Sequence, residues 1–187
     1  MGLRQSVSER RTEKMSDVSF RGMTFLFNIM DFIYPYIGRR IRNFGIKEGM
    51  TVVDYGCGSG RYAVKFAKLV GENGRVYAVD IHELAIAAIK KRIRKDNLRN
   101  IEPILIQGYD STLPDKVADV ICVIDMFFGI KKPTEFLKEL KRIIKNDGTL
   151  VIDDGHQPRS VTKTKILNSG LWDIVEETHD HLKCKVR

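Results

Sequence analysis

A glycine-rich turn between a buried strand and an amphipathic helix is the feature that most constrains this chain. Residues 51–55 have the composition of a buried strand, glycines follow at positions 56, 58 and 60, and a helical pattern begins at Tyr62. Glycine lets the backbone turn tightly and lets a ligand approach the bare main chain. The next helix presents unpaired N–H groups at its N-terminus. The turn predicts a strand–loop–helix unit with a ligand site at the loop.

The rest of the chain continues this alternation of strands and helices. Alternating elements of this kind predict right-handed βαβ units and an α/β fold with a mostly parallel sheet. We expect Asn146-Asp147-Gly148 to form the turn between the third helix and its strand. The expected strands are 51–55, 75–79, 103–107, 118–124, 149–153, 171–178 and 181–186, and the expected helices are 62–70, 83–95, 133–145 and 161–168.

Composition limits the classes of protein to which the chain can belong. Its 187 residues suit one domain, and 43% hydrophobic with 30% charged residues excludes collagen-like and largely disordered chains. Three widely spaced cysteines, Cys57, Cys122 and Cys184, predict neither a disulfide framework nor a zinc site, so we expect a reducing cytoplasm. The net charge of +8 leaves room for an anionic partner without identifying one.

Asp80 is the second candidate binding residue. It closes the second expected strand, 20 residues after Gly60, where a carboxylate can accept hydrogen bonds from a ribose diol. Its alternative role is to cap the helix that begins near His82. The glycine spacing is G-x-G-x-G rather than G-x-G-x-x-G, which favours a nucleoside ligand over a pyrophosphate.

At this point the chain resembles the class I S-adenosylmethionine-dependent methyltransferases. Residues 52–60 (Val-Val-Asp-Tyr-Gly-Cys-Gly-Ser-Gly) are similar to their first motif, and residues 79–81, 107–110, 119–126 and 136–150 are similar to the later ones. The resemblance covers Met50 to Arg187. It is nearest to the small-molecule group that includes the quinone-biosynthesis methyltransferases, although Phe128 stands where many of these carry a histidine.

The resemblance implies a Rossmann-like, seven-stranded sheet with helices on both faces and an N-terminal helical cap. We expect three regions: a flexible polar tail (1–16), the cap (17–48) and a methyltransferase domain (49–187). The resemblance implies S-adenosyl-L-methionine as cofactor, with Asp80 on the ribose and Asp110 on the adenine amine. The implied cofactor-binding residues are Asp54, Gly56, Cys57, Gly58, Asp80, Ile81, Tyr109, Asp110, Asp125 and Met126. Two of these residues have alternative roles. Asp54 could instead bind loop amides and fix the glycine-rich turn, and Asp110 could instead cap the turn that runs to Pro114.

Methyl transfer from a sulfonium is an in-line displacement, so a protein mainly holds donor and nucleophile in line and excludes water. Candidate general bases are Asp125, His156 and Asp154, since all three follow strands at the expected ligand edge. The alternative for His156 is a packed loop residue. We expect no metal site: His179, His181 and Cys184 could in principle approach a metal but are expected to lie on an ordinary hairpin.

The segment 19–44 carries two apolar stripes, one through Met23 and Leu26 and one through Phe25, and Pro35 is expected to end its first helix. The second stripe could close a lid over an apolar substrate, form a homodimer interface or lie on a membrane. Arg39, Arg40 and Arg42 fit the membrane alternative. The remaining stripe residues are Phe27, Ile29, Met30, Phe32, Ile33 and Tyr36.

Our hypothesis is methyl transfer to a small or medium-sized acceptor, possibly apolar in character, selected by the cap and by loops 125–132 and 153–160. The alternatives are a non-catalytic cofactor-binding subunit and an RNA methyltransferase. A nicotinamide oxidoreductase is disfavoured by the loop spacing. Nucleic acid is not the expected partner, because no aromatics interleave with the basic cluster at 90–95, which has the pattern of a solvated helix face.

Overall fold

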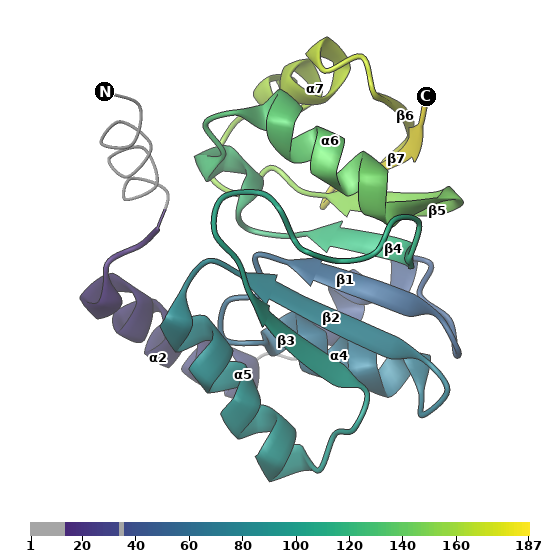
Figure 1. The fold of residues 1–187 in the computed structure, drawn as a ribbon. Coiled ribbons are helices and arrows are strands. Elements are labelled where there is room, and N and C mark those ends of the chain that lie inside the picture. The colour runs from purple at the N-terminus through teal and green to yellow at the C-terminus, as the bar shows by residue number, and fades with distance from the viewer. Residues whose placement is uncertain (1–13, 34–35) are drawn as a thin grey trace, which may run out of the picture.

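The computed structural model describes residues 14–33 and 36–187 of the chain (Figure 1). Most of the tail expected at 1–16, and Pro35, lie outside the described residues. The described side chains exclude 27–36, which contain the C-terminal part of both apolar stripes.

One seven-stranded sheet organises the molecule, in the order β3-β2-β1-β4-β5-β7-β6. All neighbouring strands are parallel except β7, which runs antiparallel to both β5 and β6. The expected Rossmann-like fold is therefore confirmed. The strands are β1 Thr51–Tyr55, β2 Arg75–Asp80, β3 Ile101–Leu105, β4 Ala118–Val123, β5 Ile144–Ile152, β6 Trp172–Glu177 and β7 Leu182–Val186.

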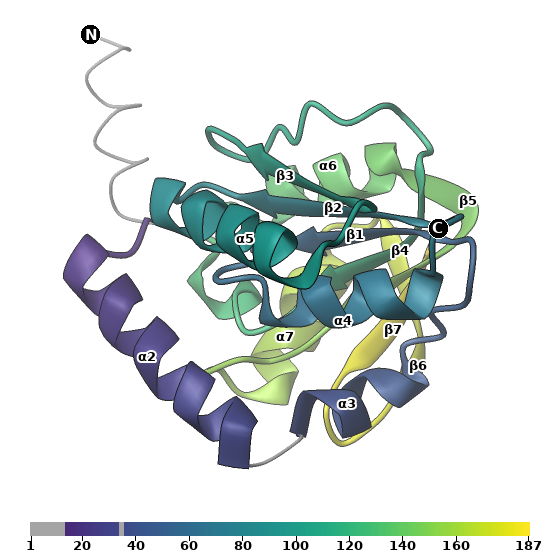
Figure 2. The same cartoon turned by 90° about the horizontal axis from the view of Figure 1, so that it is seen from below.

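Helices cover both faces of the sheet because successive side chains of each strand point to opposite sides. Val52 belongs to one buried cluster together with Phe66 of α4, whereas Val53 belongs to a second cluster with Phe136 of α6. Figure 2 shows α4 and α6 on opposite sides of β1 and β2. The helices after β1 are α4 Arg61–Val70, α5 Glu83–Asp96, α6 Pro133–Ile143 and α7 Arg159–Asn168, with a 3-10 turn η2 Phe127–Gly129.

The N-terminal segment forms α2 Asp17–Ile33, α3 Tyr36–Arg40 and the 3-10 turn η1 Ile41–Asn43. Figures 1 and 2 both show α2 beside the start of α5, at one side of the sheet. Phe20 is buried, whereas Val18, Phe25 and Leu26 are exposed. Met23 is half-buried, whereas Leu26, three residues later on the same predicted stripe, is exposed.

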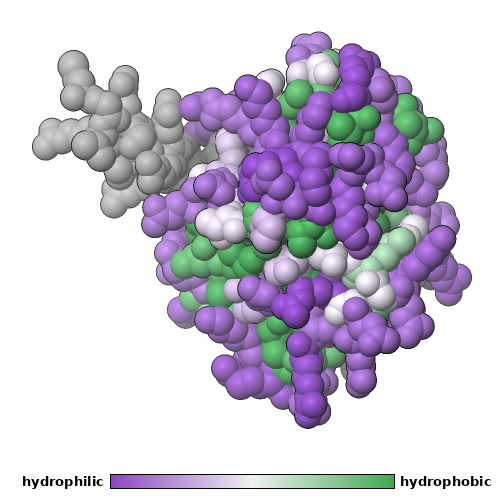
Figure 3. Space-filling model, turned by 45° about the vertical axis from the view of Figure 1, so that its right-hand side comes forward, coloured by the Kyte–Doolittle hydropathy of each residue, from purple (hydrophilic) through white to green (hydrophobic). Residues whose placement is uncertain are grey.

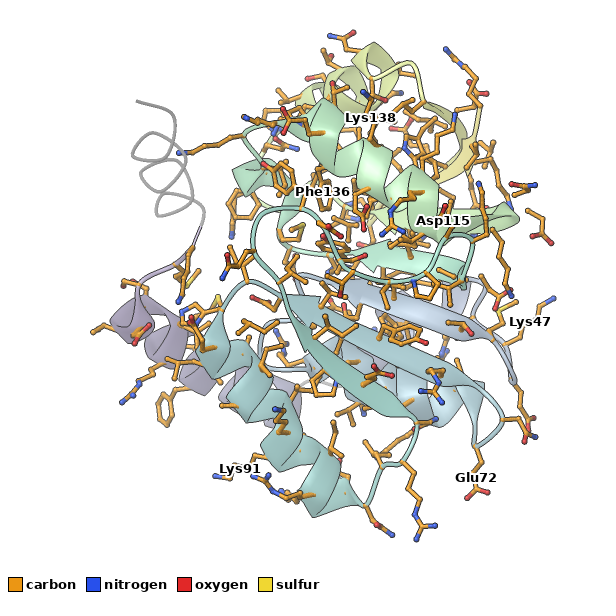
Figure 4. All side chains as sticks on the ribbon, in the orientation of Figure 1. Lys47, Glu72, Lys91, Asp115, Phe136 and Lys138 are labelled. Carbon is orange, nitrogen blue, oxygen red and sulfur yellow. The ribbon has the colours of Figure 1, made fainter. Side chains whose placement is uncertain are left out.

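Apolar residues on the exposed face of α2 are compatible both with contact to a membrane and with a homodimer interface, and both hypotheses stay predictions. No helix within the described ranges has both the length and the apolar composition that crossing a bilayer requires. Away from α2, the face shown in Figure 3 is mostly hydrophilic, with apolar residues in small patches. The basic residues of α5 are largely exposed, and Lys91 points away from the body in Figure 4, as expected for a solvated helix face.

Several sequence-based boundaries differ from the structure, and those of β3 and β5 matter most here. Strand β3 ends at Leu105, two residues earlier than expected, so Ile106 and Gln107 belong to the following loop. The residues Asn146-Asp147-Gly148 lie inside β5 and form no separate turn. The register between β4 and β5 shifts from Ala118↔Ile144 to Val120↔Thr149, so a bulge accommodates them within the strand.

Gly148 is required at this bulge, which gives a test of the fold. A Cβ there would lie 2.5 Å from Ile144 Cγ1 and 3.1 Å from the Ala118 carbonyl oxygen. We expect Gly148→Ala to lower the free energy of unfolding by about 1–3 kcal/mol in urea denaturation. The matched control is Gly22→Ala on α2, where a Cβ meets nothing within 4 Å. Equal midpoints for the two variants would contradict the bulge packing.

Candidate functional site

A cavity of about 190 Å³ opens at the carboxyl ends of β1, β2, β3 and β4. This position is the topological switch point, because the chain leaves β1 toward β2 on one side and β4 lies on the other. The wall is mostly apolar, with a few polar groups. It is lined by Met15, Phe20, Met23, Tyr55, Gly56, Gly58, Asp80, Ile81, His82, Ile106, Gly108, Tyr109, Asp125, Met126, Gly129, Ile130 and Phe136.

The loop after β1 is folded back onto the end of β2. The N–H groups of Gly56 and Cys57 both donate to the carbonyl oxygen of Val79, at 2.8 and 3.0 Å. Gly56 has φ +78°, and a Cβ there would lie 2.8 Å from Met126 Cγ. Glycine is needed at this position for both reasons, so the loop presents bare backbone to the cavity.

Asp80 fastens this loop through both of its carboxylate oxygens. Oδ2 accepts from the Gly58 N–H at 2.8 Å, and Oδ1 accepts from the His82 N–H at 2.8 Å. Burial raises the pKa of Asp80, and these amide hydrogen bonds oppose the rise. A carboxylate has about four lone-pair sites, so Asp80 keeps acceptor capacity toward the cavity. Asp80 thus binds the first amide of the segment that starts at His82, while His82 is the N-cap residue of α5, its Nδ1 accepting from the Leu84 N–H.

Asp54 lies behind the loop and not on the cavity wall. Its side chain is 2% exposed and accepts a hydrogen bond from the Ala63 N–H, while Oδ2 has no hydrogen-bond partner. Burial raises the pKa of Asp54 to about 7. This geometry supports the alternative in which Asp54 fixes the strand–loop–helix turn.

The loop after β4 brings Asp125 and Met126 to the wall. Asp125 adopts the left-handed conformation, with φ +57°, and its N–H donates to Asp153 Oδ1 at 2.9 Å. Arg40 of α3 forms an ion pair with Asp153 and lies 3.5 Å from Asp125 Oδ2. It also donates to the Tyr62 hydroxyl at 2.7 Å.

The first turns of α2 cover the side of the cavity at β2. The Phe20 ring packs on the His82 ring with centroids 4.6 Å apart, and Asp17 lies 3.6 Å from His82 Nε2. Lys14 pairs with Glu83 just outside. The cap therefore contributes part of the wall, because Met15, Phe20 and Met23 all line the cavity.

Asp110 is not brought to the cavity. Gly108, with φ +72°, turns the loop so that Tyr109 faces the wall, and a bridge joins Gln107 to Asp110. The exposed Asp110 accepts from the Thr112 N–H at 2.8 Å, which is the turn-capping alternative. Tyr109 packs its ring on Phe136, which is fully buried at the start of α6 in Figure 4.

The other predicted residues are also displaced from the wall. His156 is exposed, and its ring lies 4.9 Å from that of Phe128. Asp154 pairs with Arg159 at 2.7 Å. Cys57 is buried beneath the loop and does not line the cavity.

The histidines of the C-terminal hairpin do not converge. The side chain of His179 is 99% exposed, whereas His181 is buried with its ring 5.0 Å from that of Phe44. Over the described residues, no group of three or more His, Cys, Asp or Glu side chains could hold a metal ion.

Sequence reasoning missed Arg40, Asp153, Phe20 and His82 as parts of the site. Arg40 was interpreted as a basic residue suited to a membrane surface, but its side chain is 7% exposed and held by Asp153. The one signal in the sequence was an arginine next to an apolar helix. Its partner lies 113 residues away, beyond any local pattern.

Comparisons with known proteins agree with this geometry. The sequence profile of a family described as a methyltransferase domain matches residues 46–183. A demethylmenaquinone methyltransferase from Bacillus mycoides is 25% identical over 166 residues, which cover 83% of this chain and 68% of that protein. A ubiquinone/menaquinone biosynthesis C-methyltransferase from Escherichia fergusonii is 26% identical over 164 residues. That match covers 82% of this chain and 64% of the relative, so the chain spans about two thirds of these curated proteins.

A solved structure gives the same result. The crystal structure of an S-adenosylmethionine-dependent methyltransferase from Aquifex aeolicus superposes with a TM-score of 0.74 at 28% identity. The superposition covers 81% of this chain and 89% of that one.

The cavity residues fit the donor that these relatives use. The bare backbone at Gly56 and Gly58 admits a close ligand, and Asp80 keeps lone pairs for a ribose diol. Ile81 and Phe20 supply apolar surface for a purine ring, and Asp125 supplies a carboxylate for a cation.

Asp80 and Asp110 give the sharpest test of the cofactor site. Asp80→Ala removes the carboxylate that accepts hydrogen bonds from two loop amides and that is expected to accept from the ribose hydroxyls. We therefore expect the affinity for S-adenosylhomocysteine to fall at least about tenfold. Asp110→Ala, at an exposed position outside the cavity, should leave it unchanged. Isothermal titration calorimetry measures both. A larger loss in Asp110→Ala than in Asp80→Ala would show that Asp110, and not Asp80, is the main carboxylate contact of the nucleoside.

The buried carboxyl of Asp54 predicts a pH dependence of stability. Its ordinary pKa is 3.8 and burial raises it to about 7, so between these values the folded chain binds more protons than the unfolded chain. Stability therefore falls as the pH rises from about 4 to about 7, by up to ~1.4 kcal/mol per pH unit. Asp54→Asn removes this contribution.

Urea unfolding at pH 4.5 and pH 8 measures the effect of Asp54. The quantity compared is the free energy of unfolding of Asp54→Asn minus that of the wild type. We expect this difference to be more positive at pH 8 than at pH 4.5 by at least about 1.4 kcal/mol. Asp147→Asn, at an exposed position of β5, is the control and should follow the wild type. Parallel curves for all three proteins would contradict the raised pKa of Asp54.

Proposed function

This chain belongs to the methyltransferase-domain family and is an S-adenosylmethionine-dependent methyltransferase, and from that premise we propose that it methylates a small or medium-sized apolar acceptor. The observation that supports an apolar acceptor is the lining of the cavity. Beyond the polar groups near Asp80, the wall continues through Met23, Met126, Ile130 and Phe136. A pocket with this lining favours an apolar ligand that is oriented by a few polar contacts.

The names of the relatives support a ring compound as the acceptor. The curated proteins similar to this chain are a demethylmenaquinone methyltransferase and a ubiquinone/menaquinone biosynthesis C-methyltransferase. We therefore propose an acceptor with an aromatic or quinol-type ring, in which a hydroxyl group makes a ring atom nucleophilic. Phe128 is 39% exposed, packs on His156 and directly precedes Gly129 of the cavity wall.

S-adenosylmethionine supplies a methyl group already activated by its positive sulfur. The task of the chain is to hold the donor and the nucleophile in line and to exclude water. In our proposal the backbone of Gly56 and Gly58 contacts the donor, and Asp80 accepts from the ribose hydroxyls. Phe20 of the cap closes the cavity against solvent, since it is itself 5% exposed.

Asp125 is the proposed proton acceptor, in preference to His156. It is the carboxylate that follows β4 on the cavity wall, and its side chain is 45% exposed. As the acceptor atom bonds to the methyl carbon, the bond between that carbon and the donor sulfur would break, S-adenosylhomocysteine would leave, and the proton released from the acceptor would pass to this carboxylate. His156 lies outside the wall, so we assign it no part in the reaction.

A transfer assay tests the acceptor class. The purified chain is incubated with methyl-labelled S-adenosylmethionine and a reduced short-chain naphthoquinol, and label is counted in the organic phase. We expect transfer by the wild type and at least a tenfold loss in Asp80→Ala, because the donor would no longer be held. Asp110→Ala is the control. Label that appears only in added RNA, or in polar acceptors, would contradict an apolar acceptor.

A further inference from the structure

Three charged side chains from distant segments meet behind one part of the cavity wall. Arg40 comes from α3, Asp125 follows β4 and Asp153 follows β5. The side chains of Arg40 and Asp153 are 7% and 2% exposed, whereas that of Asp125 is 45% exposed and lines the cavity. The cluster is therefore a buried pair with one carboxylate facing the ligand space.

The backbone of Asp125 is held in a conformation that is uncommon for residues other than glycine. Its φ of +57° is left-handed, which costs a non-glycine residue on the order of 1 kcal/mol. The Asp125 N–H donates to Asp153 Oδ1 at 2.9 Å, and Asp153 Oδ2 pairs with Arg40. Arg40 thus acts on Asp125 in two ways: through Asp153, and directly across 3.5 Å.

The contacts of Arg40 are arranged to hold it in place. Its Nη1 donates to the Tyr62 hydroxyl of α4 at 2.7 Å, and Nη2 lies 3.5 Å from the Asp180 carbonyl oxygen. The planar guanidinium joins several acceptors at fixed angles, which a lysine ammonium does not reproduce. A residue of the cap, Arg40, therefore contacts the carboxylate that Asp125 places at the cavity wall.

We propose that Arg40 and Asp153 are positioning residues that hold the Asp125 carboxylate at the cavity wall, where it selects the cationic sulfonium of the donor over the neutral thioether of the product. This inference rests on the proposed cofactor site. The donor and the product share their ribose, purine and amino-acid groups and differ in the methyl group and the charge on sulfur. A carboxylate beside the sulfur is thus able to distinguish them, and it favours release of the product.

The sign of one substitution separates positioning from simple charge. If Arg40 acted only as a nearby positive charge, Arg40→Ala would remove a repulsion and raise the preference for the cationic donor. If Arg40 positions Asp125, the same change releases the carboxylate and the preference falls. Arg40→Lys keeps the charge but loses the planar geometry, so its preference should lie between those of the wild type and Arg40→Ala.

Isothermal titration calorimetry with S-adenosylmethionine and S-adenosylhomocysteine measures this preference. We express it as the dissociation constant of S-adenosylhomocysteine divided by that of S-adenosylmethionine, so a higher ratio means a stronger preference for the cationic donor. We expect the ratio to fall about tenfold in Asp125→Asn, with S-adenosylhomocysteine affinity within about twofold of the wild type. Asp153→Asn and Arg40→Ala should lower it in the same direction. The control is Arg39→Ala, the exposed neighbour of Arg40, which should keep the wild-type ratio.

The outcomes separate this inference from the proposed function. A wild-type chain that binds neither compound overturns both. A wild type that binds both, with an unchanged ratio in Asp125→Asn, overturns the role of Asp125 and leaves the cofactor site intact. A ratio that rises in Arg40→Ala overturns positioning by Arg40. Since Asp125 is partly exposed, Asp125→Asn should fold normally, and near-ultraviolet circular dichroism checks this for every variant.

Discussion

The carboxylate of Asp80 joins the two loops on which the rest of the site depends. It accepts one hydrogen bond from the loop after β1, at Gly58, and one from its own loop, at His82. Hydrogen bonds to a charged acceptor are stronger than neutral ones, and here both donors are main-chain amides. The position of the glycine loop, the start of α5 and the contact of His82 with the cap all follow from this one group.

The parts of the fold that could be predicted from the sequence are those with a local cause. Strand β1 and helix α4 follow from an apolar run and an apolar stripe, and Gly56 and Asp80 follow from the spacing between strands. The bulge in β5 was missed because Asn146-Asp147-Gly148 has the composition of a turn. Its actual conformation is set by pairing with β4, which is a tertiary effect.

The site could be predicted only in part, for a related reason. Asp110 was assigned to the ligand by its place in a motif, but the turn at Gly108 sends Tyr109 to the wall instead. The link between Arg40 and Asp153 has no sequence signal, because it needs α3 to lie across the ends of β4 and β5. Motifs located the loop backbone that lines the cavity, and packing decided which side chains surround it.

The burial of Cys57 affects the chemical stability of the glycine-rich loop after β1. Burial raises the pKa of the thiol well above its ordinary value, and the neighbouring charges of Asp80 and Asp54 raise it further. The thiolate is the form that oxidants and alkylating agents attack, so a thiol held protonated in this way reacts slowly. The sulfur atom beneath the glycine-rich loop is thereby kept in its unreactive thiol form, so the backbone above it is not disturbed by a modified side chain.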